Sequence, residues 1–309
     1  MDYVLLAAGF VLLIKGADWF VDGSAGAAKR LHIPTVIVGL TIVSLGTSLP
    51  ELSVSLTAAI NGRNALALSN VLGSNIFNTL VVVGCSALLA PFVMGREIRR
   101  RDTLWNVGVT VLLCIMCYFG VLTRLDGILL LAVLAVYLWV LVKSALKSRK
   151  ESQEKEEEAD LLSWGQCGVL ILTGIVCIAL GGNVTVDAAK ALAEAWGWSE
   201  ALIGLTIVSI GTSLPELVTS VVAAKKGESG LSIGNALGSN IMNITFILGL
   251  SSAIHPIAVL PENFIDVLIL AAVALLIWAM AKASDKLNRK RGILFLLIYA
   301  AYFVYILQR

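Results

Sequence analysis

The chain carries the stretch Gly39-Leu-Thr-Ile-Val-Ser-Leu-Gly-Thr-Ser-Leu-Pro-Glu-Leu52, and the pattern returns 165 positions later as Gly204-Leu-Thr-Ile-Val-Ser-Ile-Gly-Thr-Ser-Leu-Pro-Glu-Leu217. Each copy places one carboxylate, Glu51 or Glu216, in an otherwise apolar segment. A carboxylate at mid-membrane depth costs about 2.5–3.5 kcal/mol even on a lenient insertion scale, so it normally faces a cavity, a partner or an ion. Two such acids at matching places in two repeats indicate one shared site.

The composition places the chain in a bilayer. Of its 309 residues, 58% are hydrophobic and 14% are charged, and its mean hydropathy of +0.89 is far too apolar for a soluble domain of this length. A membrane-spanning helix needs about 20 apolar residues. Ten spans are predicted on that basis, near 3–27, 35–60, 66–92, 104–122, 127–146, 164–186, 200–223, 231–255, 264–281 and 292–308. Gly, Pro, Ser and Asn interrupt the second, third, seventh and eighth spans, which is typical of broken helices that line a cavity.

Charge patterning predicts the orientation of the chain. If the spans alternate sides, most Lys and Arg residues fall in loops on one side, and the positive-inside rule then places both termini outside. The basic residues are not interleaved with aromatic residues in a patch, so nucleic acid is not an expected partner. The five cysteines all fall in apolar stretches without a zinc-binding pattern, so we expect reduced packing residues.

The chain divides into two halves around its only long charged run. We predict a first five-helix repeat over residues 1–146, a charged cytoplasmic linker over 147–163 and a second five-helix repeat over 164–309. Because five is an odd number, the second half must enter the membrane in the opposite sense to the first. The fold class predicted is therefore an all-α membrane protein of ten transmembrane helices in two inverted repeats, with binding at their interface.

The first motif offers oxygen atoms beside each acid. Pro50 has no N–H to donate to the carbonyl of Gly46, so carbonyl oxygens near Glu51 are loosened from the helix. Thr47 and Ser48 lie four and three residues before Glu51, so all three address one side of a helix. The second copy repeats this arrangement with Thr212 and Ser213.

A second repeated motif lies on the third and eighth spans, as Asn70-Val-Leu-Gly-Ser-Asn-Ile-Phe-Asn78 and Asn235-Ala-Leu-Gly-Ser-Asn-Ile-Met-Asn243. Polar residues at four-residue intervals form a stripe in each copy, namely Asn70, Ser74 and Asn78 in one and Asn235, Ser239 and Asn243 in the other. These donors are all oxygens, which suit calcium with its shell of about six to eight oxygens, and sodium as well. Close packing through small residues and interhelical hydrogen bonding are the alternative roles of the Ser, Thr, Gly and Asn residues.

At these two motifs the chain resembles the cation/calcium exchanger superfamily, the sodium/calcium exchanger-like membrane proteins, and its bacterial branch in particular. The resemblance covers both halves and implies that the second, third, seventh and eighth helices enclose adjacent cation positions. It implies that the first and sixth helices slide across this core to expose the site to either side. The ligands that it implies are Glu51, Glu216, Thr47 and Thr212 for calcium and Ser48, Ser74, Ser213 and Ser239 for sodium, with Asn78 and Asn243 flanking the central site.

One departure from the family pattern concerns the coupling ion. Where sodium/calcium exchangers resemble the second motif, one repeat ends it with Asp, but here Asn243 is neutral. Asn at both positions is similar to proton/calcium exchangers, whereas Thr-Ser-Leu-Pro-Glu is similar to the sodium branch. Together Glu51 and Glu216 carry a charge of −2, which one calcium, two sodium ions or two protons neutralise.

The expected function is therefore calcium/cation antiport by alternating access in a prokaryotic inner membrane, with calcium exchanged for sodium and protons as the alternative driver. No cofactor is expected, the partners are the transported ions and the lipid bilayer, and a monomer is expected to suffice. A passive cation channel would use the same oxygens. An enzyme using the two acids as general acid and base is not expected, because the chain has no His-Glu-x-x-His motif or credible Ser-His arrangement.

Overall fold

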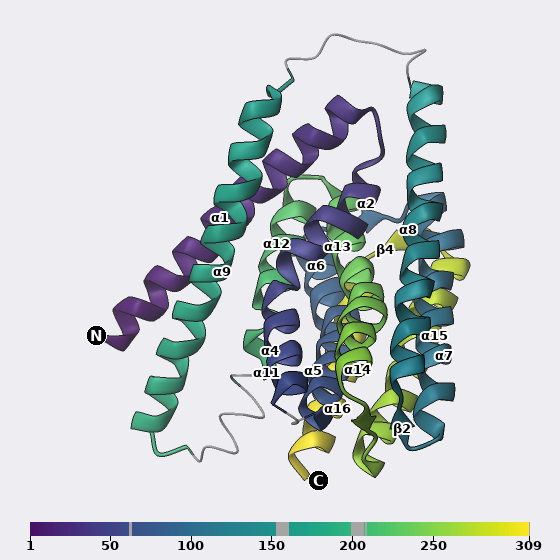
Figure 1. Ribbon diagram of the computed structural model, residues 1–309. Coiled ribbons are helices and arrows are strands. Elements are labelled where there is room, and N and C mark those ends of the chain that lie inside the picture. The colour runs from purple at the N-terminus through teal and green to yellow at the C-terminus, as the bar shows by residue number, and fades with distance from the viewer. Residues whose placement is uncertain (62–63, 153–160, 199–206, 208, 309) are drawn as a thin grey trace.

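A computed structural model describes residues 1–61, 64–152, 161–198, 207 and 209–308, and these are mostly helical (Figure 1). The first half contains α1 (Asp2–Leu31), α2 (Thr35–Val38), η1 (Gly39–Val43), α3 (Ser44–Thr47), α4 (Leu49–Ile60), α5 (Asn64–Phe77), η2 (Asn78–Val82), α6 (Val83–Leu89), η3 (Ile98–Asp102), α7 (Thr103–Tyr118) and α8 (Arg124–Ser152). The second contains α9 (Trp164–Ala195), α11 (Ser209–Gly211), α12 (Leu214–Lys225), α13 (Ser229–Met242), η5 (Asn243–Leu248), α14 (Gly249–Ile254), α15 (Pro261–Ala283) and α16 (Arg289–Gln308).

Within these residues, seven helices are long and apolar enough to cross a membrane, and a bent pair makes an eighth span. That pair joins Thr35–Thr47 to Leu49–Ile60 at an angle of 52°, so the predicted break in the second span is confirmed. The bend falls just before Pro50, which is tolerated there because it lies in the first turn of α4. The fourth predicted span, α7, has only 16 residues. Residues 200–206 and 208 of the seventh predicted span lie outside the described residues.

The third and eighth predicted spans are continuous, so the breaks predicted in them are wrong. Each runs as one helix, over Leu66–Leu89 and Ser229–Ile254. Their polar residues are accommodated by π-helical segments, η2 and η5, which begin at Asn78 and Asn243. A π-helical turn widens the helix without leaving it, and such turns are frequent at functional sites.

The predicted linker is partly helical. Helix α8 continues to Ser152, and residues 153–160 of the linker lie outside the described residues. Helix α9 begins at Trp164 because Ser163 and Gln166 cap it reciprocally. The Gln166 N–H donates to the Ser163 hydroxyl at 3.2 Å, and the Ser163 N–H donates to the Gln166 side chain at 2.7 Å.

Four two-residue strands, which the all-helical prediction omitted, form two antiparallel pairs at opposite ends of the bundle (Figure 1). The strands are β1 (Phe92–Val93), β2 (Val121–Leu122), β3 (Ile257–Ala258) and β4 (Lys286–Leu287). In the β1–β4 pair Phe92 lies opposite Leu287, and in the β2–β3 pair Leu122 lies opposite Ile257. A shift of 165 residues converts the first pair into the second. Each strand therefore pairs across the two halves, in matching register.

Helices α1 and α9 pack against each other in antiparallel sense along one side of the molecule (Figure 1). A Cβ atom added to Gly16 would lie 2.8 Å from the backbone nitrogen of Ile178, and one added to Gly181 would lie 2.6 Å from that of Leu13. Glycine is needed at these positions because the two backbones approach so closely. Since α1 and α9 are equivalent in the two sequence repeats, their opposite directions match an inverted arrangement.

The interior of the larger bundle is formed by α4, α5, α12 and α13. Both continuous spans that carry the second motif are mostly buried, whereas less than a third of the most apolar stretch of α8, α9 or α16 is buried. An apolar surface of this kind is stable against lipid, because lipid tails are as apolar as the side chains. The polar motifs are therefore held at the centre of the bundle.

Candidate cation site

The two acids of the first motif are completely buried. Glu51 lies in the first turn of α4 and Glu216 in the first turn of α12, and both are 0% exposed. The free N–H groups and the dipole at a helix N-terminus favour negative charge in the first turn. Each break before a Leu-Pro-Glu sequence therefore starts a new helix whose first turn supports the buried acid.

Serine hydroxyls link each acid to the opposite half of the chain. The Ser48 hydroxyl donates to Oε1 of Glu216 at 2.8 Å, and the Ser213 hydroxyl donates to Oε1 of Glu51 at 3.1 Å. The 165-residue shift between the repeats converts each of these two hydrogen bonds into the other. Each acid is therefore bonded to a serine from the turn that precedes the other acid, and this cluster brings together two acids that are far apart in sequence.

The serines of the second motif complete this cluster. The Ser74 hydroxyl donates to Oε1 of Glu51 and the Ser239 hydroxyl to Oε1 of Glu216, each at 3.4 Å. Ser213 also bonds to Ser74 at 3.1 Å. The four serines predicted as sodium ligands thus all contact the Oε1 atoms of the two acids.

The outer asparagines of the stripe tie each broken helix to its neighbour. The Asn70 amide donates to the Ser55 hydroxyl at 3.0 Å and to the backbone oxygen of Glu51 at 3.4 Å. Asn235 makes the same contacts with Ser220, at 2.9 Å, and with the oxygen of Glu216, at 3.3 Å. These residues hold the acid-bearing turns in place.

Two inner asparagines and a threonine join α5 to α13, and the sequence prediction did not single them out. The Asn75 amide donates to the backbone oxygen of Asn240 at 3.1 Å, and the Asn240 amide donates to the Thr79 hydroxyl at 2.7 Å. The Asn243 amide donates to Oδ1 of Asn75 at 3.0 Å. The repeated Gly-Ser-Asn-Ile sequence was the available signal, because Asn75 and Asn240 lie within it.

Several buried side-chain oxygens of the two motifs have no partner among the described residues. They include Oε2 of Glu51, Oε2 of Glu216, and Oδ1 of Asn78, Asn240 and Asn243. Buried polar atoms are normally satisfied, so free oxygens on the acids and on asparagines of the second motif indicate a ligand that accepts oxygen donors. The described residues contain no cluster of three or more His, Cys, Asp or Glu side chains, so any cation here relies on hydroxyl, amide and carbonyl oxygens besides the two acids.

The two threonines predicted as calcium ligands differ in their surroundings. The Thr47 hydroxyl is fully buried and donates to Oδ1 of Asn235 at 3.0 Å. The Thr212 hydroxyl has no partner among the described residues and lines a cavity of about 370 Å³. Pro50, Pro215 and Asp187 also line this cavity, which lies between α4, α9 and α12.

In the other repeat, an ion-pair cluster lies beside α1, at positions equivalent to those that line the cavity beside α9. Nζ of Lys226, which follows α12, lies 2.6 Å from a carboxylate oxygen of Asp18 and 2.7 Å from one of Asp22. Partial burial works to lower the pKa of Lys226, but the hydrogen bonds and charges of Asp18 and Asp22 outweigh it and raise that pKa above its usual value. A raised lysine pKa keeps Lys226 positively charged at lower pH, and this charge is lost only as pH rises through the raised value.

The structure thus brings together Glu51, Glu216 and the four predicted serines, whereas Asn78 and Asn243 begin the π-helical segments η2 and η5 and, within the described residues, make no hydrogen bond to either acid. Their role as ion ligands stays a prediction. The fold and the buried oxygen cluster define a membrane transporter for cations. Consistent with that class, the chain belongs to the sodium/calcium exchanger protein family, whose pattern matches residues 1–143 and 168–308. It is a cation antiporter of that family, which consists of transporters rather than enzymes.

Individual relatives match along nearly the whole chain. The putative antiporter CaxA of Alkalimonas amylolytica is 36% identical over 308 residues, covering 97% of this chain and 96% of the relative. Inner membrane protein YrbG of Escherichia coli is 35% identical over 301 residues, covering 94% of this chain and 92% of the relative. A solved structure of the sodium-calcium exchanger NCX_Mj superposes with a TM-score of 0.86 at 30% identity, covering 99% of this chain and 98% of that one.

Proposed function

We propose that this chain exchanges calcium for sodium across a prokaryotic inner membrane by alternating access. The observation that carries the proposal is the reciprocal bonding of Ser48 to Glu216 and Ser213 to Glu51, beside acid oxygens without protein partners. A charge of −2 in one buried cluster matches one calcium or two sodium ions. Competition of these ions for one pair of acids is a sufficient mechanism for exchange.

The proposal includes the arrangement of the whole chain. Ten helices form two inverted repeats, residues 1–146 and 164–309, joined by the linker 147–163, with both termini outside. The antiparallel α1–α9 pair and the exchanged β1–β4 and β2–β3 pairs support the inversion. The site lies within one chain, so a monomer suffices for transport. The membrane assignment fits the relative that is named an inner membrane protein.

Ligand roles follow from the positions of the oxygens. Glu51 and Glu216 bind calcium with the backbone oxygens of Thr47 and Thr212, and Ser48, Ser74, Ser213 and Ser239 contribute to sodium binding. Asn78 and Asn243 flank the centre through amide oxygens that have no partner among the described residues. These oxygen donors suit a hard cation such as calcium or sodium.

Proton coupling is the second candidate, and the neutral Asn78 and Asn243 favour it because they add no further charge to bind extra sodium. Flux measurements in proteoliposomes separate the two. Calcium uptake is measured under an imposed sodium gradient and then under a pH gradient, with ionophores clamping the voltage. We expect the sodium gradient to drive uptake. Uptake driven only by the pH gradient would assign proton coupling, and uptake driven by neither would refute antiport.

A further inference from the structure

A groove between α7 and α8 lies on the opposite side of the bundle from the α1–α9 pair and forms no part of the cation site (Figure 1). Its volume is about 420 Å³, and apolar residues of α7 line it together with Val133 of α8. Leu104 on its edge is 53% exposed, so the groove opens toward the surrounding lipid. A Cβ atom added to Gly108 would meet nothing within 4 Å, so this glycine leaves part of the groove empty.

Trp105, which lines the groove, packs against the interior of the bundle. The Trp105 ring packs against the fully buried Tyr137 ring of α8, with centroids 5.3 Å apart. From Leu104 to Leu112 the groove follows α7 for about 12 Å, which is close to the depth of one leaflet of a hydrocarbon core that is about 30 Å thick. Its length and apolar lining therefore suit an acyl chain.

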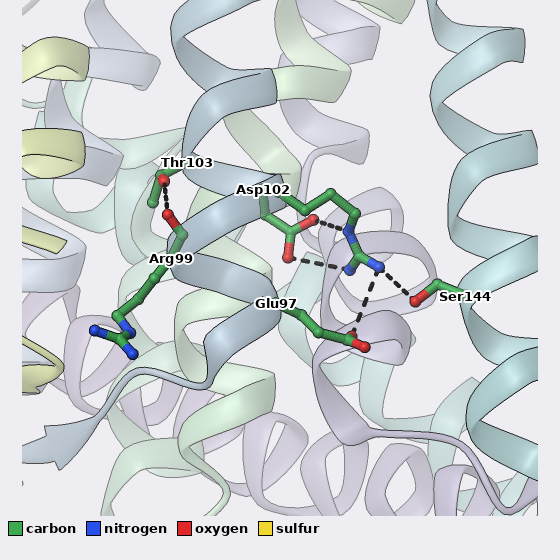
Figure 2. Close-up of polar contacts among 6 residues, drawn as sticks. Glu97, Arg99, Asp102, Thr103 and Ser144 are labelled. Atoms are coloured by element: carbon green, nitrogen blue, oxygen red, sulfur yellow. Dashed lines mark hydrogen bonds and ion pairs between the residues drawn. The ribbon is translucent and has the colours of Figure 1, made fainter. Parts of the chain in front are cut away.

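Two arginines, Arg100 and Arg101, stand at one end of this apolar groove. Figure 2 shows that Arg101 is held by protein groups, with two bonds to Asp102 at 2.7 and 3.1 Å, one to Ser144 at 2.6 Å and an ion pair with Glu97 at 3.6 Å. Its charge is thus compensated. Arg99 points away from this cluster (Figure 2).

Arg100 differs from both neighbours. It is exposed, it borders the groove, and within the described part of the chain it has neither an ion-pair partner nor a side-chain hydrogen bond. An uncompensated cation at the end of an apolar groove complements a molecule with a negative head and an apolar tail. Basic pockets between membrane helices bind the head groups of anionic lipids by this combination.

We propose that the groove binds one anionic phospholipid, with its phosphate against Arg100 and an acyl chain along Leu104, Gly108 and Val133. Arg101 fixes the shape of the charged end, because Asp102 and Ser144 hold its side chain in place. This site is independent of the coupling ion of the transporter.

Native mass spectrometry of the purified full chain tests the proposal, with phosphatidylglycerol as the probe and phosphatidylcholine as the neutral comparison. Arg100→Gln is expected to lower phosphatidylglycerol affinity about fivefold, since one basic residue near a lipid surface contributes about that factor. Arg96→Gln is the matched control and should retain wild-type affinity. It removes an exposed arginine that lies four residues before Arg100 and does not line the groove.

A second variant tests the acyl half of the site. Gly108→Leu fills the empty part of the groove, improves helix propensity and should lower phosphatidylglycerol retention without lowering the unfolding temperature. The proposal is overturned if phosphatidylcholine binds as tightly as phosphatidylglycerol, or if Arg96→Gln and Arg100→Gln weaken binding equally. Displacement of the lipid by inorganic phosphate alone at equal concentration would also overturn it, because the site would then recognise an anion without a tail.

Discussion

The α9 side and the α1 side of the cation site receive nearly the same residues from the two repeats, yet Thr212 borders a cavity on the α9 side, the open side, whereas Thr47 is fully buried on the α1 side, the closed side. On the open side, Asn183 and Asp187 line that cavity together with Thr212. Their counterparts in the other repeat are Asp18, Asp22 and Thr47. There Lys226 bridges the two aspartates and Thr47 is fully buried.

The difference lies in charged residues that the repeats do not share. The counterpart of Lys226 is Asn61, and the counterpart of Asp18 is Asn183, so these positions cannot form an equivalent ion pair between α9 and the core. A carboxylate oxygen of Asp187 does lie 3.8 Å from Nζ of Lys190, but both residues belong to α9, so this ion pair does not connect α9 to another helix. Near-symmetric repeats thus supply the two acids and the four serines, and we expect the asymmetric charges to control access from each side.

The strongest change is expected in calcium transport, when either of the two buried acids at the centre of the site is replaced. Either Glu51→Gln or Glu216→Gln should abolish calcium exchange in proteoliposomes, because each removes half of the negative charge from one buried site. Glu262→Gln, the same change at an exposed position in the first turn of α15, is the control and should transport normally. Exchange by either acid variant at the parent rate would mean that the acids are structural.

Removing the α1-side ion pair should reduce the difference between the sides. In a chain whose five native cysteines are replaced by alanine, Ser53→Cys on the α9 side should react with a thiol reagent faster than its counterpart Val218→Cys. Lys226→Gln should then raise the Val218→Cys rate by about twofold to fivefold, the range expected for partly exposed ion pairs. Lys225→Gln serves as the neighbouring control. Equal rates with and without Lys226 would show that packing alone closes this side.

Transplanting the ion pair should close the open side in part. The double change Asn61→Lys with Asn183→Asp supplies the α9 side with the charges of its counterpart, beside the existing Asp187. We expect the Ser53→Cys labelling rate to fall by about twofold, a smaller effect because the new pair is not matched to its surroundings. Asn61→Gln is the uncharged control. A labelling rate that does not change would argue that the asymmetry has another origin.

The smallest expected effect is on stability. Thr47→Val removes the bond to Asn235 and leaves a buried amide oxygen without that donor, which costs about 1–3 kcal/mol. Thr212→Val should cost less, because its hydroxyl bonds to no described residue. Thermal unfolding of the two variants in detergent measures the difference. A larger loss for Thr212→Val would contradict the hydrogen bonding described for the closed side.

The repeated motifs allowed the buried acids and their serines to be predicted, because a carboxylate that recurs beside Ser and Pro in a membrane span is too costly to persist without a ligand or partner. The hydrogen bonds between the two halves, from Ser48 to Glu216 and from Ser213 to Glu51, depend on tertiary packing, which the periodicity of the sequence does not encode. The same holds for Lys226, whose partners lie more than 200 positions away. The sequence also predicted breaks where the structure has the π-helical segments η2 and η5. Polar residues within an apolar span are compatible with either feature, so the sequence pattern does not distinguish them.

Equilibrium binding of radioactive calcium to the purified chain shows whether the two acids form a single site, because it requires neither a gradient nor movement. We expect one calcium per chain, displaced by sodium, and lost in Glu51→Gln and in Glu216→Gln alike, since both acids hold the same ion. Retained binding in either variant, or two independent calcium ions of which each variant loses one, would contradict a single shared site.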